Sequence, residues 1–293
     1  MGKMLKGRTT FQLTLAPHQG DRAESSRQAS SAFRHFAFGG HGTFMQLTVL
    51  GCGDAFGSGG RLNTCFQLDA RRRDDGGATR LLVDCGASAM ISMHRFGTDP
   101  DSIDAIAITH LHGDHFGGLP FLLLYLQFEA KRTRPLEIAG PPGTQQRVKA
   151  ACDALFGSID CRWGFDLSFR EWGEDAPLSL AGVEVTPRQV YHGEGVVAFG
   201  LRVRDADKTF AYSGDTTWVD ALPALAAEAD LFVVECYAFD RPLPTHTDYR
   251  TLQAHLDELT ARRIALTHMS RCMLERQDEL RLETLDDGRV IEL

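Results

Sequence analysis

The stretch "ITHLHGDHFGGLP", Ile108–Pro120, follows a strand-like apolar run and carries four side chains of the kind that bind metal ions. It contains the pattern H-x-H-x-D-H, formed by His110, His112, Asp114 and His115. In extended chain, side chains two residues apart lie on the same side, so the first two histidines face one way. A following helical turn directs Asp114 and His115 the other way. The stretch therefore predicts two half-sites for two metal ions.

Each half-site needs further ligands from elsewhere in the chain, because zinc and similar ions take at least four ligands and favour imidazole and carboxylate. Three candidates stand at strand ends: His192 after "TPRQVY", Asp215 in "AYSGDT", and His268 in "ALTHMS". A carboxylate between two cations can bridge them, which makes Asp215 the natural shared ligand. We therefore expect a dinuclear metal centre.

The surrounding sequence alternates short apolar strands with helical stretches, as the hydrophobic periodicity indicates. Two strand-rich halves, each carrying helices, predict an α/β (α+β) fold arranged as a four-layer αββα sandwich. The expected helices lie at 88–96, 116–131, 145–156 and 249–259. The expected strands lie at 46–51, 64–69, 80–86, 104–110, 136–140, 182–192, 198–204, 208–216, 229–236 and 263–270.

The composition is that of a soluble globular protein, with 293 residues of which 43% are hydrophobic and 24% charged. No apolar run reaches the ~18 residues that span a bilayer, so no membrane association is expected. Seven cysteines, none in a C-x-x-C pair, make a disulfide framework or a cysteine zinc knuckle unexpected. A reducing, cytoplasmic location fits this composition best.

The first 44 residues differ from the rest and predict a flexible N-terminal tail, residues 1–44, before a hydrolase domain, residues 45–293. The tail holds six basic and two acidic side chains, so of the whole chain's formal charge of −8 the remaining 249 residues carry −12. A transit peptide and a misassigned start at Met45 are two further interpretations of the tail.

A glycine-rich stretch, "GCGDAFGSGG" at Gly51–Gly60, follows the first strand as a dinucleotide fingerprint would. Its spacing is G-x-G-x-x-x-G and it leaves no room for the phosphate-binding helix, so an active-site loop is the better interpretation. Arg61 and Asn63 close this loop near the expected metal face. For them, contact with a substrate phosphate and plain hydrogen bonding within the loop are equally balanced hypotheses.

The H-x-H-x-D-H pattern resembles that of the metallo-β-lactamase superfamily, and the resemblance covers about residues 45 to 270. It implies that His110, His112 and His192 hold one metal ion. It also implies that Asp114, His115 and His268 hold the other, with Asp215 as the bridge. The stretches "AYSGDT", "AFGLRV" and "PTHTDY", which contains His246, are most similar to the ribonuclease Z group of phosphodiesterases.

The chain departs from ribonuclease Z where that group carries a flexible arm for transfer RNA. Only 23 positions separate His192 from Asp215, and no arm fits there. The acidic body also lacks the basic surface that long nucleic acids favour. We therefore expect a small-molecule or short phosphodiester substrate, cyclic or linear, rather than a long nucleic acid. Because relatives of this type often dimerise, a homodimer is also an expectation.

The expected mechanism uses two divalent cations, of zinc or else manganese or iron, to lower the pKa of a shared water that attacks phosphorus as hydroxide. Asp114 is both a ligand and the acceptor of the water's proton. His246 is the candidate acid for the leaving alkoxide, with Glu235 as its orienting partner. The competing interpretations are a surface histidine for His246 and a locally satisfied strand end for Glu235.

Other activities use the same kind of site on the same fold, so the fold does not select the substrate. The first alternative is a thioester or lactone hydrolase, which would not need His246 as a leaving-group acid. The second is a tRNA 3′-processing endoribonuclease. A non-catalytic binding protein is disfavoured because all seven ligand residues are present.

Overall fold

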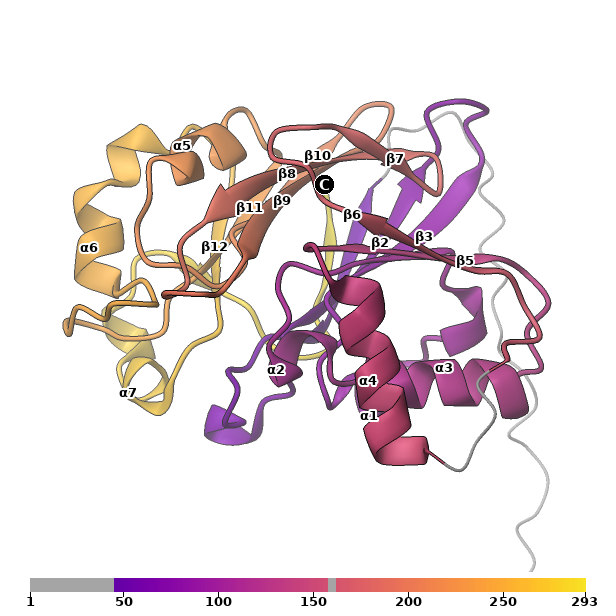
Figure 1. Cartoon of the computed structure of the whole chain (residues 1–293). Coiled ribbons are helices and arrows are strands. Elements are labelled where there is room, and N and C mark those ends of the chain that lie inside the picture. Colours follow the sequence, from indigo (N-terminus) through magenta and orange to yellow (C-terminus); the bar gives the residue numbers. More distant parts are fainter. Residues whose placement is uncertain (1–44, 158–161) are drawn as a thin grey trace, which may run out of the picture. The chain divides into compact units, whose positions relative to one another are not determined.

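Two β-sheets form the centre of the structure, a computed structural model that describes residues 45–157 and 162–293 (Figure 1). Within these residues each sheet has seven strands, in the orders β14-β1-β2-β3-β4-β5-β6 and β13-β12-β11-β10-β9-β8-β7. The strands of the first sheet are β1 (Gln46–Gly51), β2 (Cys65–Arg71), β3 (Ala78–Val83), β4 (Ala105–Ala107), β5 (Leu136–Gly140), β6 (Leu167–Glu171) and β14 (Val290–Glu292). Those of the second are β7 (Leu178–Leu180), β8 (Val183–Val190), β9 (Ala198–Arg204), β10 (Thr209–Tyr212), β11 (Leu231–Glu235), β12 (Ile264–Thr267) and β13 (Glu283–Thr284).

Helices cover the outer face of each sheet, as Figure 1 shows. The first sheet carries α1 (Ala89–Phe96), α2 (Gly113–Phe116), α3 (Leu119–Phe128) and α4 (Thr144–Phe156). The second carries α5 (Ala221–Ala226), α6 (Tyr249–Ala254) and α7 (Arg271–Leu274). Short 3₁₀ turns are η1 (Ser58–Gly60), η2 (Pro100–Ser102), η3 (Leu256–Glu258) and η4 (Gln277–Glu279).

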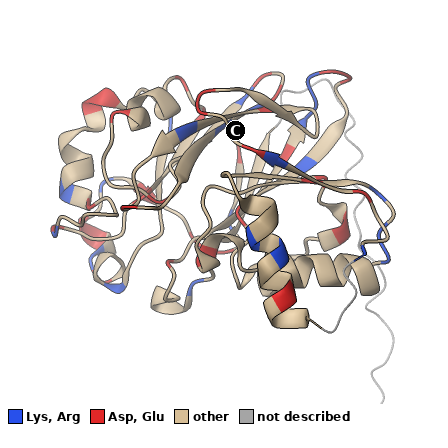
Figure 2. Cartoon of the chain, in the orientation of Figure 1, with Lys and Arg blue, Asp and Glu red and all other residues tan. Residues whose placement is uncertain are grey.

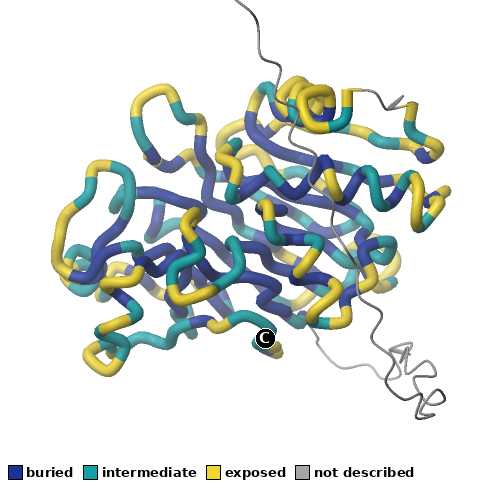
Figure 3. Tube along the Cα trace, turned by 90° about the horizontal axis from the view of Figure 1, so that it is seen from below, coloured by how far each residue is buried: buried dark blue, intermediate teal, exposed yellow. Residues whose placement is uncertain are grey.

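Three buried apolar layers hold these elements together, and Figure 3 shows the strands as the most continuously buried part of the described chain. The middle layer joins the two sheets through side chains such as Phe66, Tyr212 and Val233. The second layer packs the other face of the first sheet on α1, α3 and α4. The third packs the second sheet on α5 and α6. The predicted αββα sandwich is thus confirmed.

Strand direction explains why one edge of the sandwich can collect polar side chains. Strands β3, β4 and β5 are parallel neighbours in the first sheet, and β10, β11 and β12 are parallel neighbours in the second. Strand β8 runs the same way as β10, because β9 is antiparallel to both. A hydrogen bond from Phe199 N to Thr109 O, 3.0 Å long, links the two sheets at the carboxyl ends of these strands. The loops that follow the strands therefore meet at one edge.

Several elements differ from the sequence-based prediction. The helical turn expected at Asp114 and His115 is α2, and the helix expected at 116–131 is α3, which begins three residues later and ends three residues earlier than expected. The strand expected at 104–110 ends at Ala107, and the next residues form the loop that carries the histidines. Strands β6, β7, β13 and β14 and helices α5 and α7 were not predicted. The predicted tail, residues 1–44, lies outside the described residues.

None of the helices in the described part of the chain is both long and apolar enough to cross a membrane.

Candidate metal centre

The seven predicted ligand residues lie together at the edge where the strands end, in two groups that share that edge. Within each group, one ligand atom of every residue lies within 4.8 Å of those of the others. The first half-site consists of His110, His112 and His192. The second half-site consists of Asp114, His115, Asp215 and His268.

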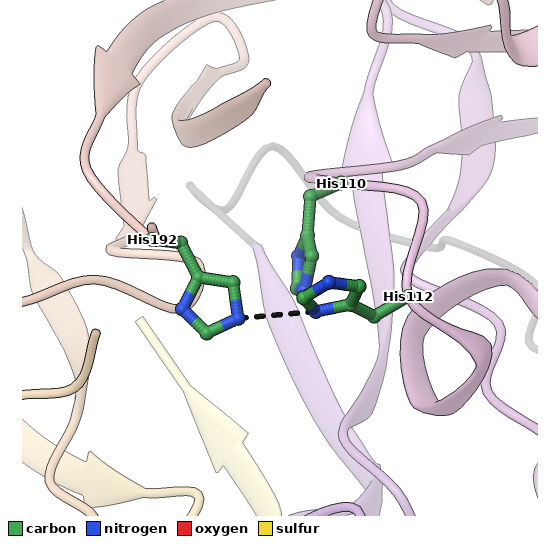
Figure 4. Close-up of side chains that lie close together, drawn as sticks. All are labelled: His110, His112 and His192. Carbon is green, nitrogen blue, oxygen red and sulfur yellow. Dashed lines mark hydrogen bonds between the residues drawn. The ribbon is translucent and has the colours of Figure 1, made fainter. Parts of the chain in front are cut away.

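The first half-site consists of three imidazole rings whose nitrogens converge (Figure 4). The Nδ1 atom of His112 lies 3.1 Å from Nε2 of His110 and 3.1 Å from Nε2 of His192. Two nitrogens at about 2.05 Å from one tetrahedral zinc ion would lie about 3.3 Å apart. The spacing of the three nitrogens therefore suits a single small cation between them.

The second half-site contains both carboxylates. Its His115 Nε2 atom lies 3.3 Å from Asp114 Oδ2 and 3.2 Å from Asp215 Oδ2, and His268 Nε2 also lies 3.2 Å from Asp215 Oδ2. The same Asp215 oxygen is 4.0 Å from His110 Nε2 and 3.9 Å from His192 Nε2, in the first half-site. Asp215 thus stands between the two groups, where a bridging ligand would be.

Neighbouring groups fix the orientation of three of these rings. The Nδ1 atom of His192 lies 2.7 Å from the backbone oxygen of Thr245, and Nδ1 of His110 lies 3.1 Å from Thr109 Oγ1. The Nδ1 atom of His115 lies 2.7 Å from Asp84 Oδ2. Because each Nδ1 donates its proton to an oxygen, each Nε2 keeps a lone pair for a cation.

Asp84 was not identified from the sequence, where it appears only as one residue of the strand-like segment "RLLVDCG". It follows β3 directly, is fully buried, and adopts a left-handed backbone with φ of 59°. Besides His115, its carboxylate accepts hydrogen bonds from Thr109 N (2.8 Å) and Thr109 Oγ1 (2.9 Å). A buried Asp at a strand end, in a conformation that costs about 1–3 kcal/mol, is the kind of residue that orients a site.

Burial keeps most of the imidazoles neutral. It lowers the pKa of His110 well below its ordinary value, lowers that of His192, and lowers that of His268 to about 4. A neutral ring can donate its lone pair to a cation, whereas a protonated ring cannot.

The pKa of His115 is raised and that of Asp215 is lowered, because the two side chains form a close pair of opposite charge. Burial would lower the pKa of His115, but the carboxylates of Asp215 and Asp84 outweigh it and raise that pKa well above its ordinary value. Burial would raise the pKa of Asp215, but His115 and His268 outweigh it and hold it well below its ordinary range. In the absence of a cation, His115 therefore carries the positive charge at this position.

Two buried atoms at the centre have no hydrogen-bond partner, Nε2 of His115 and Oδ1 of Asp215. An unsatisfied buried polar atom costs about 1–3 kcal/mol, and both atoms are of types that bind divalent metal ions. A cation would give each of them a partner. The residues present therefore fit the divalent metal ions that proteins of this fold bind.

His246 and Glu235 form a pair beside the two half-sites. His246 Nδ1 lies 2.8 Å from Glu235 Oε1, and Glu235 is fully buried at the end of β11. Burial would lower the pKa of His246, but the hydrogen bond to Glu235 and its charge raise it, and burial raises the pKa of Glu235 to about 7. Glu235 also accepts from Thr216 N at 2.9 Å. The pair can thus hold a proton near neutral pH.

The position of His246 admits a second role. Together with His192 and Asp215 it forms a third group whose ligand atoms lie within 4.8 Å of one another. Its ring stacks on that of Tyr237, with centroids 4.8 Å apart, and Tyr237 was not singled out in the sequence. The acid role predicted for His246 therefore stays a prediction, with a ligand role as the alternative.

The polar groups of Arg61 and Asn63 are engaged with the protein itself. Arg61 donates to the backbone oxygen of Leu285 at 2.8 Å and pairs with Asp286 at 2.5 Å, and its side chain is only 12% exposed. Asn63 Nδ2 donates to Asp54 O at 3.2 Å. The contact of Asn63 agrees with hydrogen bonding within the loop, whereas Arg61 joins the loop to residues near the end of the chain, and contact with substrate stays a prediction for both residues.

Comparison with known proteins places this centre in a family. The model of the family described as "Anti-Pycsar protein Apyc1" matches residues 45–285. An uncharacterized protein of Mycobacterium leprae (strain TN) is 31% identical over 240 residues, which are 78% of this chain and 80% of that protein. A ribonuclease Z of Mycobacterium sp. (strain KMS) is 30% identical over 198 residues, which are 64% of this chain and 67% of that protein.

Among solved structures, the metallo-β-lactamase fold protein YhfI from Bacillus subtilis superimposes with a TM-score of 0.66. The match has 22% identity and covers 84% of this chain and 99% of YhfI. At that identity the likeness concerns the fold, and it agrees with the two-sheet architecture described above.

Proposed function

This chain belongs to the family described as anti-Pycsar protein Apyc1, as a metallo-β-lactamase-fold hydrolase related to ribonuclease Z, and from that premise we propose that it is a metal-dependent phosphodiesterase. Its substrate on this proposal is a small or short phosphodiester, cyclic or linear. The observation that carries the proposal is the set of two adjoining half-sites joined by Asp215, with the His246–Glu235 pair beside them.

His110, His112 and His192 would hold one divalent ion, and Asp114, His115 and His268 the other, with Asp215 shared. Two such ions, which we propose to be zinc, would lower the pKa of a water molecule and stabilise charge on the phosphoryl oxygens. Asp114 is 12% exposed at its side chain, so its carboxylate can reach a water at the centre and accept its proton.

His246 would deliver the second proton, to the departing alkoxide oxygen. Its Nδ1 atom is occupied by Glu235, which leaves Nε2 for the substrate. The raised pKa of His246 keeps a proton available near neutral pH, and positioned acids of this kind contribute about 10²–10⁴ in rate. A thioester does not need such a donor, because a thiolate leaves readily without a proton.

A compact substrate is supported by the segment between the two ligands His192 and Asp215. The 23 positions that separate them hold β9, β10 and the short turn that joins these strands. Basic and acidic residues are interspersed along the ribbon of the described chain in Figure 2. Both features favour a small diester over a long nucleic acid, whose binding depends on many clustered cations. A homodimer and a cytoplasmic location stay predictions.

An activity panel on the metal-analysed full-length protein tests the proposal. We expect hydrolysis of bis(4-nitrophenyl) phosphate and of cyclic mononucleotides, with slower turnover of an acyl thioester and of a lactone. Efficient turnover of the thioester or the lactone, with both phosphodiesters untouched, would reject it.

The His246→Ala variant tests the acid role. It should slow a diester with a poor alkoxide leaving group about 10²-fold or more, and slow the 4-nitrophenyl diester far less, because nitrophenolate departs without a proton. Metal content should stay at two ions per chain. Equal losses of rate on both diesters, or loss of a metal ion, would reject the acid role and assign His246 to the metal centre as a ligand.

A further inference from the structure

Phe56 is the most exposed large apolar side chain in the described part of the protein, with 80% of its surface open to solvent. Single exposed apolar side chains are common on protein surfaces, so exposure by itself indicates nothing. Phe56 differs from Phe128, which is 52% exposed on α3, in how its backbone is held and in what its loop adjoins.

The loop that carries Phe56, residues 54–61 and here called the Asp54 loop, is held by its own first residue. The Asp54 carboxylate is fully buried and accepts from Phe56 N (3.1 Å), Ser58 N (2.9 Å) and Ser58 Oγ (2.7 Å). On the far side, a Cβ placed on Gly59 would lie 2.7 Å from Leu274 Cδ1, so the loop packs against α7. The backbone beneath Phe56 is thus fixed before any ligand arrives.

Both ends of the Asp54 loop adjoin the second half-site. Thr64 follows the loop, and its Oγ1 donates to Gly53 O at 3.0 Å and lies 3.5 Å from His268 Nδ1. The backbone N–H of His268 donates to Cys52 O at 3.0 Å. The loop in which Phe56 is exposed therefore begins two residues after Cys52 and ends three residues before Thr64, and both of these residues contact His268.

We propose that Phe56 is a specificity residue, whose ring is the platform on which a planar aromatic group of the phosphodiester, such as a nucleobase, stacks. The proposal rests on the proposed function, because it assigns the part of the substrate that lies beyond the phosphoryl group. A ring on an ordered backbone loses little freedom when a ligand stacks on it, which favours binding. Stacking of one base on an aromatic side chain changes affinity about 5- to 150-fold, or about 1–3 kcal/mol.

The kinetic test compares a cyclic mononucleotide with glycerol 1,2-cyclic phosphate, a diester that has no base. Phe56→Ala should raise KM for the nucleotide about 10-fold with kcat nearly unchanged, and should leave both constants for the base-free diester unchanged. Phe56→Trp should restore the nucleotide KM, because an indole ring also stacks. Phe128→Ala is the matched control, because it removes another exposed phenylalanine, on helix α3, and it should change neither KM.

A binding measurement gives a readout that does not depend on turnover. By calorimetry, Phe56→Ala should weaken binding of a nucleoside monophosphate about 10-fold and leave binding of ribose 5-phosphate unchanged. Equal effects on ligands with and without a base, or no effect on either, would overturn the proposal. A fall in molecular mass of Phe56→Ala on size-exclusion chromatography would also overturn it, because the ring would then belong to a contact between two copies. If the wild-type protein hydrolyses neither diester, the proposed function fails, and the calorimetric comparison still decides the stacking role.

Discussion

The two half-sites differ in charge and in burial although the same strand ends build them. The first half-site consists of three imidazoles, of which His112 is exposed, and its rings are oriented by neutral groups of Thr109 and Thr245. The second half-site contains two carboxylates, and a third, that of Asp84, orients its His115 ring. The carboxylate of Asp215 lies close to both.

This difference shows that the positions of the ligand atoms and the charge around them contribute separately to the affinity for metal ions. Parallel strands bring both sets of ligand atoms to one edge, but the second half-site contains two carboxylates, whereas the first half-site only shares that of Asp215. Attraction between opposite charges is stronger where water is excluded. We therefore expect the second half-site to bind its ion more tightly than the first.

Removing the shared carboxylate should have the largest effect. Asp215→Ala should release both ions and lower phosphodiester hydrolysis by about 10³-fold or more, because a bound cation supplies several kcal/mol of transition-state stabilisation. Metal analysis together with steady-state kinetics measures this. Retention of both ions by the variant would show that Asp215 does not bridge the half-sites.

Neutralising the carboxylate behind His115 should weaken one half-site selectively. Asp84→Asn should lower the affinity of the second half-site about 10- to 100-fold, because it keeps the shape of the side chain and removes the charge that orients and polarises the ring. Competition with a coloured chelator gives both affinities. Asp153→Asn, on the exposed face of α4, is the matched control and should change neither. Equal weakening of both half-sites by Asp84→Asn would contradict the selectivity.

The two ions should leave at different chelator concentrations. We expect the ion of the first half-site to leave first, with an affinity about 10-fold lower or more, because its one charged ligand is the shared Asp215 and His112 is exposed to water. His112→Ala should accordingly keep about one ion per chain after dialysis. Simultaneous loss of both ions from the wild-type protein across a chelator series would refute the ranking.

The two half-sites should also differ in the number of protons that they release when an ion binds, which is the smallest of these effects. Because the pKa of His115 is raised, its ring holds a proton to higher pH than the other buried rings do, and it must lose that proton to bind a cation. The pKa values of His110 and His192 are lowered, so these rings are already neutral. Calorimetry in buffers of different ionisation enthalpy should detect about one proton released when the tighter ion binds at the second half-site. Close to none should be released when the weaker ion binds at the first half-site. The reverse order would contradict this assignment.

Sequence patterns predicted the sandwich and singled out seven residues that the structure brings together, because both depend on short-range regularities. Apolar runs of strand length ended in His110, His192 and His268, and parallel strand ends meet at one edge whatever the loops do. The strands β6 and β7 were missed because their side chains are largely exposed and show no apolar run. Helix α7 was missed because it is four residues long, too short to show a period.

The supporting residues could not be predicted for a different physical reason. Asp84 and His115 are 31 positions apart, and Arg61 and Asp286 are 225 apart, so their pairing is a property of the folded chain. Nothing in the local sequence distinguishes the buried Asp84 from an aspartate that begins a surface turn. Its left-handed backbone conformation becomes visible only when the partners that hold it are in place.

The most direct measurement is the rate of bis(4-nitrophenyl) phosphate hydrolysis as zinc is added stepwise to the chelator-treated full-length protein. Two ions are needed both to activate the attacking water and to stabilise charge on the phosphoryl oxygens. We therefore expect little hydrolysis up to one ion per chain. The rate should then rise to a plateau at two. Full activity at one ion per chain would contradict the dinuclear centre. No diester hydrolysis at two ions, with turnover of a thioester or a lactone in the same sample, would contradict the assignment as a phosphodiesterase.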